Sequence, residues 1–417
     1  MISHLDKAVP PANWPAPPKM VSFSAMSDME SCPRKWALTQ AEYPDIWDQS
    51  GYPRAMGYGN AKGQITHMSV ELLIKALESN GCSDLRSKEA VEAIRGLGGF
   101  TKLLEDVRNR FIQEQTLNPR MEKTLPELER RLVKDAPDQI SLVRSMLIRS
   151  GFTGAVQSAG SPVEEEDYSI SEAMRSHLGM GSHPEVFLRS EEIGWIGIAD
   201  LITIGPDLCE IRDFKTGGEE TYHENQLKIY AALWYKDKRL NPKSKLANRL
   251  TLSYPHRDVE IPSPTLAEVD HLLVDLKERA DTAKAALLEN PPKAVASADN
   301  CRWCSVKQLC DEYWVESTQQ NLFNETQGET QFIDAQIKLE NRRDALVWRG
   351  TVDCGRELDS GDQVTIMLQA PDEDLRAGRT IRIIGARTLS GDNKGGQDDE
   401  IPSIEFISTT ERFFCDV

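Results

Sequence analysis

Two aspartates and one lysine within residues 193–217 stand where packing alone would not place them. Every second residue from Ile196 to Ile204 is an isoleucine, except for Asp200 at the centre. Alternate side chains of a strand share one face, so the pattern predicts an apolar stripe interrupted by a carboxylate. An unpaired carboxylate is costly to bury, and a cation is therefore expected beside it.

The residues after this strand predict a hairpin. Gly205–Leu208 has the composition of a turn, with proline at its second position. In a tight hairpin Asp200 faces Asp213 across the ladder, and Lys215 lies two residues further along the same face. A slip of one residue would turn one of the aspartates to the opposite face.

Two facing carboxylates repel each other unless a cation lies between them. Lys215 supplies one positive charge, and Mg²⁺ or Mn²⁺ would supply more. Hard cations favour carboxylate oxygens and keep bound waters, which suits a site that binds phosphate and activates water. The alternative is an ion-paired pair of strands at the edge of a sheet.

Other candidates lie outside the hairpin. His67 belongs to a predicted amphipathic helix at 57–77, where it is either a ligand or a core residue. Glu185 begins a short strand and is either an outer metal ligand or, as we favour, a solvent-exposed residue on an edge strand. Gln226 and Tyr230 lie four residues apart on a predicted helix and share a face suited to contacts with phosphates or bases. In the alternative, Tyr230 is core and Gln226 faces solvent.

Three cysteines near residue 300 form a C-x2-C-x5-C cluster, at Cys301, Cys304 and Cys310. Thiols so close together indicate metal ligation, and such a centre normally has four of them. Iron–sulfur clusters and zinc both accept four thiolates, so the spacing does not separate them. The remaining candidates for the fourth ligand are Cys32, Cys82, Cys209, Cys354 and Cys415.

The overall composition is that of a cytoplasmic protein with two or three domains. The chain has 417 residues and a net charge of −17, which argues against a surface that binds nucleic acid everywhere but leaves room for a local basic groove. No apolar run is long enough to span a membrane. Residues 1–20 are proline-rich and lack the pattern of a secretory signal.

Taken together, these motifs resemble those of the RecB-like branch of the PD-(D/E)XK nucleases, in the iron–sulfur form found in AddB subunits and CRISPR adaptation nucleases. Each motif is weak alone, but their number and order make the resemblance specific. Besides the cysteine cluster, the motifs are C-P-R-K at 32–35, G-x3-H at 63–67, G-x2-D at 197–200, D-F-K-T-G at 213–217 and Q-x3-Y at 226–230.

The resemblance implies roles for the site residues. His67, Asp200 and Asp213 would bind Mg²⁺ or Mn²⁺, and Lys215 would position or polarise the attacking water. Gln226 and Tyr230 would orient the substrate and the lysine. A structural 4Fe-4S cluster would be held by Cys32, Cys301, Cys304 and Cys310, closing a loop of about 270 residues, which restricts the unfolded chain strongly. Zinc at these cysteines is the alternative.

The predicted fold is a mixed α/β sheet flanked by helices, a restriction-endonuclease-like core at 21–314. A helical insertion is expected at about 84–179, and a small all-β domain such as an OB-fold at 331–417. In that domain Trp348 and Phe332 would stack on the bases of a single strand, unless the domain serves to dock a partner or cap the nuclease.

The expected function is metal-dependent hydrolysis of DNA, on single strands or duplex ends, with exonuclease favoured over endonuclease action. The setting would be DNA repair, recombination or defence against foreign DNA. The chain has no G-x4-GK[ST] phosphate loop, so a helicase motor would be a separate subunit. The rival hypothesis is a non-catalytic DNA-binding or scaffold subunit of a helicase–nuclease or defence complex.

Overall fold

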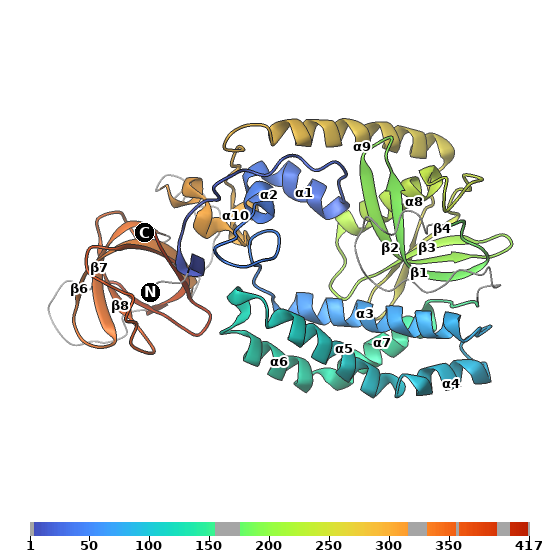
Figure 1. Ribbon diagram of the computed structural model, residues 1–417, viewed down its shortest axis with the longest axis horizontal. Coiled ribbons are helices and arrows are strands. Elements are labelled where there is room, and N and C mark those ends of the chain that lie inside the picture. Colours follow the sequence, from blue (N-terminus) through green and yellow to red (C-terminus); the bar gives the residue numbers. More distant parts are fainter. Residues whose placement is uncertain (1–3, 155–175, 316–331, 356–357, 390–400, 416–417) are drawn as a thin grey trace.

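The computed structural model describes residues 4–154, 176–315, 332–355, 358–389 and 401–415. Figure 1 shows a sheet with helices on both sides and, at the other end of the molecule, a separate all-β unit. A short segment that contains the cysteine cluster lies between these two parts. Among the described helices, none combines the length and apolar character needed to cross a membrane.

The central sheet has the order β1-β2-β3-β4-β5, with β3 and β4 parallel and the other neighbours antiparallel. Leu201 lies opposite Arg212, so the predicted hairpin register is confirmed, and its extension by one residue pairs Asp200 with Asp213. Strand β5 was not expected from the sequence. The strands are β1 (Gly181–Ser190), β2 (Trp195–Ile204), β3 (Cys209–Phe214), β4 (Arg249–Ser253) and β5 (Asp258–Ile261).

The predicted isoleucine stripe on β2 is wrong as a single apolar face. Ala199 and Ile202 belong to the same core cluster, although three residues apart on a regular strand they would point to opposite faces. The alternation shifts at Asp200, where the paired residues of β1 are interrupted and Glu185 has a φ of 48°. Ile198 is consequently 38% exposed. Asp200 therefore lies at the point on β2 where the side chains in this core cluster change from one face of the strand to the other.

Helices cover both faces of the sheet (Figure 1). One face packs against α1 (Phe23–Ser31), α8 (Thr221–Lys236) and α9 (Leu266–Ala286). On the other side lies a helical layer, in which α3 packs against the helices of the expected insertion. Part of the expected insertion, 155–175, lies outside the described residues. The layer consists of α3 (Tyr58–Ser79), α4 (Lys88–Gly96), α5 (Gly99–Gln115), α6 (Leu125–Lys134) and α7 (Ala136–Arg149).

The C-terminal unit is a small barrel. Its strands join in the ring β6-β7-β8-β10-β9 and back to β6, with β8 and β10 parallel and β11 added beside β9. Trp348 is 5% exposed in the barrel core, so its predicted stacking on bases is wrong, whereas Phe332 is 48% exposed. The strands are β6 (Phe332–Arg342), β7 (Val347–Gly355), β8 (Gln363–Met367), β9 (Thr380–Leu389), β10 (Ser403–Glu405) and β11 (Glu411–Phe414).

The barrel is fastened to the rest of the chain by buried polar contacts. The Arg120 guanidinium donates two hydrogen bonds to Glu411 of β11, at 2.7 and 2.8 Å, and others to the carbonyls of Pro53 and Ser305. The N-terminal segment adds backbone bridges at both ends, pairing Lys7 with Phe414 of the barrel and Val21 with Trp195 of the sheet.

Candidate active site

The end of the β2–β3 hairpin brings the two predicted aspartates and the lysine together. The ammonium group of Lys215 lies 2.6 Å from Oδ2 of Asp213. The backbone N–H of Phe214 donates to Oδ2 of Asp200, at 2.6 Å, which fixes that carboxylate against the neighbouring strand. The local folding follows from the tight turn at 205–208, whose register places both acids at the same level of the ladder.

His67 reaches this site from α3, with Nδ1 3.4 Å from Oδ2 of Asp200. Gly63, one turn earlier on the helix, explains how α3 comes so close. A Cβ atom at this position would lie 3.0 Å from the hydroxyl oxygen of Thr216, in the loop that follows β3. The glycine of the G-x3-H motif therefore admits the loop and lets the histidine approach the sheet.

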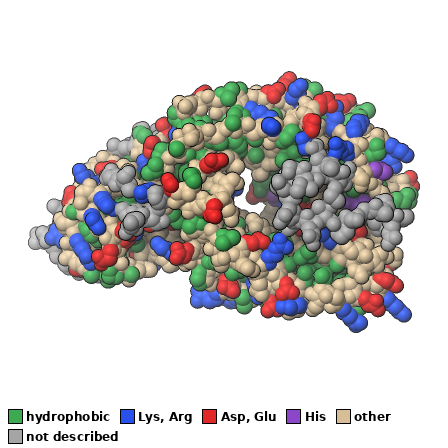
Figure 2. Space-filling model, viewed as in Figure 1, with side chains coloured by type: hydrophobic (Ala, Val, Ile, Leu, Met, Phe, Trp, Pro, Cys, Tyr) green, Lys and Arg blue, Asp and Glu red, His purple; other side chains and the backbone are tan. Residues whose placement is uncertain are grey.

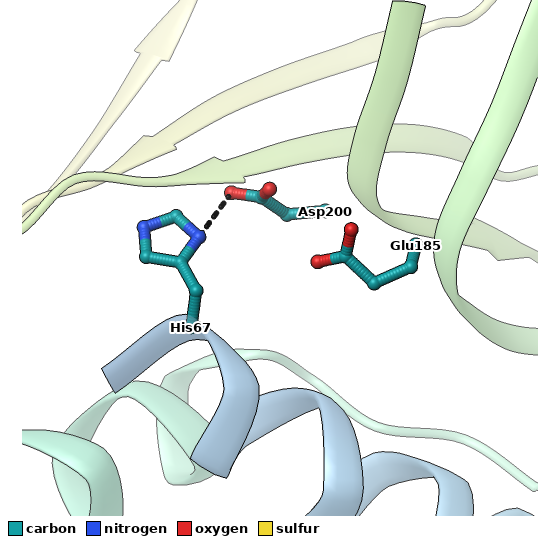
Figure 3. Close-up of side chains that lie close together, drawn as sticks. All are labelled: His67, Glu185 and Asp200. Carbon is teal, nitrogen blue, oxygen red and sulfur yellow. Dashed lines mark ion pairs between the residues drawn. The ribbon is translucent and has the colours of Figure 1, made fainter. Parts of the chain in front are cut away.

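Glu185 is the third member of the cluster (Figure 3). Donor atoms of His67, Glu185 and Asp200 all lie within 4.8 Å of one another. Glu185 is on an edge strand, as expected, but it is half-buried and turned toward Asp200, so the solvent-exposed interpretation is wrong. The signal that sequence analysis lacked is the left-handed backbone at Glu185, which no pattern of residue types announces.

Asp213 does not belong to the group of three donors that lie within 4.8 Å of one another among the described residues. Its carboxylate pairs with Lys215 instead, and it is only 4% exposed. No well-directed hydrogen bond from the described residues reaches its buried Oδ2, although the Lys215 ammonium is close. This oxygen therefore retains the capacity to bind a further cation.

The Q-x3-Y motif lies behind the lysine on α8. The Lys215 ammonium donates to Oε1 of Gln226 at 2.8 Å, and Nε2 of Gln226 donates to the Tyr230 hydroxyl at 2.7 Å. Tyr230 is 6% exposed, so it supports the glutamine from the core and does not reach a base. Its ring fits because Gly197 has no side chain, since a Cβ there would lie 2.7 Å from the ring.

The electrostatics of the cluster show an excess of negative charge. Burial and the Asp200 charge raise the pKa of Asp213 to about 6, against the effect of Lys215. Burial, Asp200 and Glu71 raise the pKa of Glu185 to about 8. Burial tends to lower the pKa of His67, but Asp200, Asp213 and Glu185 outweigh it and raise that pKa to about 9.

The pKa of Asp200 is lowered despite its burial, because His67, the Phe214 N–H and Lys215 favour the carboxylate. The pKa of one acid is thus lowered while those of its two neighbours are raised, as expected where three carboxylates share too little positive charge. The donor set of imidazole and carboxylates fits a hard divalent cation.

The four predicted cysteines line one cavity. Cys32 lies between α1 and α2 (Pro33–Gln40), and the other three follow in the segment that begins with α10 (Ala298–Arg302). The backbone N–H of Val295 donates to the Cys32 sulfur at 3.4 Å. Burial raises the pKa of Cys304 to about 11, and the neighbouring thiols Cys310 and Cys301 add to the effect. Four such thiols around one space have the chemistry of a metal centre.

The spacing of these thiols bears on which centre fits. No three of the four sulfurs, all of which are described, lie within 4.8 Å of one another. A single zinc ion with bonds of about 2.3 Å would draw all four sulfurs to within about 4 Å of each other. A four-iron cluster places its own iron and sulfide atoms between the thiolates and holds them further apart.

A model of the PD-(D/E)XK nuclease superfamily matches residues 20–311, most of the chain before the barrel. The chain therefore belongs to the PD-(D/E)XK nuclease superfamily. This match covers the hairpin, the histidine helix and the cysteine segment described above. None of the curated proteins matches the chain significantly.

Proposed function

We propose that this protein is a metal-dependent deoxyribonuclease that acts on single-stranded DNA or duplex ends. The observation that carries the proposal is the convergence of His67, Glu185 and Asp200 beside the Asp213–Lys215 pair. These residues surround a space with more acid than base, which a divalent cation would neutralise. Figure 2 shows an opening through the middle of the molecule, which would offer a route for a strand.

Mg²⁺ or Mn²⁺, when bound, would lower the pKa of a coordinated water and neutralise charge on the scissile phosphate. Asp200 and His67 would hold the ion, and the carboxylate of Asp213 would complete its ligands. Glu185, which the sequence assigned at most to an outer position, is here included among them. Lys215 would orient the water and stabilise charge on the phosphate, while Gln226 restricts where its ammonium group can go.

A cleavage assay tests this function. Labelled single-stranded, blunt, flapped and circular DNA would be incubated with the protein and Mg²⁺ or Mn²⁺. We expect Lys215→Ala to lower the rate about 10²- to 10³-fold, the usual effect of losing one charge-stabilising group. Lys277→Ala, an exposed lysine on α9, is the matched control. Equal rates for Lys215→Ala and the unaltered protein would instead favour a non-catalytic DNA-binding or scaffold subunit.

The same substrate panel separates exonuclease from endonuclease action, since circular DNA resists an enzyme that needs an end. We favour exonuclease over endonuclease action. The biological setting that we propose is DNA repair, recombination or defence against foreign DNA. A separate helicase or defence-complex subunit would deliver the strand, and a copurification experiment with tagged protein would identify it.

For the cysteine centre we propose a 4Fe-4S cluster, supported by the wide spacing of the four sulfurs. It would fasten α1 and α2 to the segment after α9. Anaerobically purified protein should be brown and contain four irons per chain, and Cys304→Ser should lose them. Cys82→Ser, a change in the helical core, should keep them. A colourless protein with one zinc per chain would overturn the assignment.

The C-terminal unit is proposed to be an OB-fold. Its support is the ring of five strands with one parallel pair, which is a small Greek-key barrel. With Trp348 in the core, Phe332 is the remaining predicted contact for single-stranded DNA. Phe332→Ala should weaken binding of an oligonucleotide by the intact protein, and unchanged affinity would favour docking or capping as the role of the barrel.

A further inference from the structure

The exposed end of α8 carries an aromatic side chain that the Q-x3-Y motif does not include. Tyr222, Gln226 and Tyr230 follow one another at intervals of four residues, so they lie along one face of the helix. Tyr230 is buried, and Gln226 binds the catalytic lysine. Tyr222 continues the row outward and is 51% exposed.

Tyr222 contacts two other aromatic rings. Its ring stacks on Phe23, the first residue of α1, with centroids 6.3 Å apart and planes 20° apart. The edge of His223 packs against it, with centroids 4.4 Å apart. One distant segment and the next residue of the same helix thus contact the ring, while much of its surface remains open to solvent.

Helix geometry gives the spacing between Tyr222 and Gln226. Four residues span about 6 Å along a helix, so Tyr222 begins about one turn from the glutamine that contacts Lys215. That is about the length of one nucleotide along an extended strand. A strand with its phosphate at the metal site could therefore place a neighbouring base at this ring.

The charges around Tyr222 favour a base over a phosphate. Glu220 and Glu224 are exposed on the same loop and first helical turn, whereas the nearby Glu219 is paired with Arg257. The first two carboxylates, which no cation among the described residues neutralises, would repel the backbone of a nucleic acid. An aromatic face in such surroundings attracts the uncharged, flat part of a nucleotide, since every base has a π face.

We propose that Tyr222, held by Phe23, is a stacking site for the nucleobase next to the scissile phosphate. The inference rests on the proposed nuclease function and specifies its substrate: a strand whose terminal or flanking base is unpaired. A base in an intact duplex is already stacked between its neighbours and cannot use the ring. The site therefore selects single-stranded or frayed DNA.

A binding measurement tests this site without relying on cleavage. Single-stranded oligonucleotides with 2-aminopurine at successive positions would be titrated with the protein in Ca²⁺. Stacking should quench the fluorescence at one position with unaltered protein and with Tyr222→Phe, which keeps the ring. Tyr222→Leu keeps an apolar side chain without a ring and should abolish that quenching. Quenching that persists in Tyr222→Leu overturns the proposal.

A second measurement tests whether the effect of the Tyr222 ring on binding requires the base. Tyr222→Leu should weaken binding of single-stranded DNA by about 5- to 100-fold, the range for one stacked base. An oligonucleotide with an abasic position at the quenched site should bind both proteins equally. Equal weakening on the normal and abasic strands would mean a purely structural role. Normal stacking without any cleavage by the unaltered protein would sink the nuclease function and leave a base-binding site.

Discussion

The two faces of strand β3 carry buried charges in opposite states. On one face, Arg212 donates to Glu210 at 2.8 Å, to Ser253 at 2.6 Å and to Asp258 at 2.5 Å. Arg149 of the helical layer also pairs with Asp258, at 3.1 Å. On the other face, Asp213 has Lys215 as its close cation and faces Asp200. The Arg212 side, which we call the closed face, has two arginines for its two acids. The Asp213 side, which we call the open face, is short of positive charge.

This difference separates structural from functional charge on a single strand. A buried ion pair with several hydrogen bonds is expensive to break but does no chemistry. Burial and a neighbouring carboxylate raise the pKa of the acid on the open face, so a cation that binds beside it is stabilising. Substitutions on the closed face should therefore lower stability, whereas substitutions on the open face should lower activity.

The largest effect is expected from Asp213→Asn on the open face. Removal of a metal-binding carboxylate should lower the cleavage rate about 10³- to 10⁴-fold, equivalent to about 4–5.5 kcal/mol. Stability without metal should stay level or rise, because a repelling charge is lost. Single-turnover cleavage and denaturant unfolding would measure the two quantities. A large loss of stability would mean that the charge of Asp213 has a structural role, like that of Arg212.

On the closed face, Arg212→Met should lower the unfolding free energy by about 3–5 kcal/mol, because Glu210 and Asp258 lose their partner inside the protein. Cleavage by the folded fraction should stay within about tenfold of the original rate. The control is Arg257→Met, which breaks an exposed pair with Glu219 and should cost at most about 1 kcal/mol. Similar costs for the two arginines would erase the distinction between the faces.

On the open face, both metal-free stability and metal binding should depend on pH. Asp213, Glu185 and His67 have pKa values of about 6, 8 and 9, each above its value in an unfolded chain. The folded chain therefore binds more protons, and metal-free stability should fall as the pH rises from about 4 to 9. Mn²⁺ competes with these protons, so its stabilisation should grow with pH, toward about 2–3 kcal/mol at a hundredfold excess over Kd.

Thermal unfolding with and without Mn²⁺ from pH 5.5 to 8.5 would measure this linkage. In Asp213→Asn the increase with pH should shrink, because one of the competing protons is gone. A Mn²⁺ effect independent of pH would mean that the ion binds elsewhere.

The smallest effect is expected from Gly197→Ala. Its Cβ would lie 2.7 Å from the ring of Tyr230, which is buried and cannot move aside freely. Overpacking of this kind costs about 1–3 kcal/mol. The displaced ring should loosen Gln226 and lower cleavage modestly through Lys215. Unfolding and cleavage assays on the same sample would show whether both change, and a change in stability alone would remove Gly197 from the support of the lysine.

The sequence predicted those parts of the site that depend on local order. The hairpin register followed from the turn at 205–208, and the helices that bear His67 and Gln226 followed from their spacing. The four cysteines do line one cavity. In each case the residues that determine the structure lie close together in the chain, or share a motif.

The parts that were wrong depend on contacts between distant segments. The shift of the β2 pattern at Asp200 arises from an irregular Glu185 on another strand. The same irregularity turns Glu185 into the site. The burial of Trp348 depends on closure of a barrel whose last strand comes more than fifty residues later, near Ile404. Alternation within one strand does not say which of its faces a partner will cover.

The Arg120 contact has a consequence for how the molecule melts. One buried guanidinium is shared by the helical layer, the cysteine segment at Ser305 and the barrel at Glu411. A fragment that ended before residue 331 would lose this ion pair and expose the guanidinium to water. The contact should therefore couple the melting of the nuclease core to that of the barrel in calorimetry.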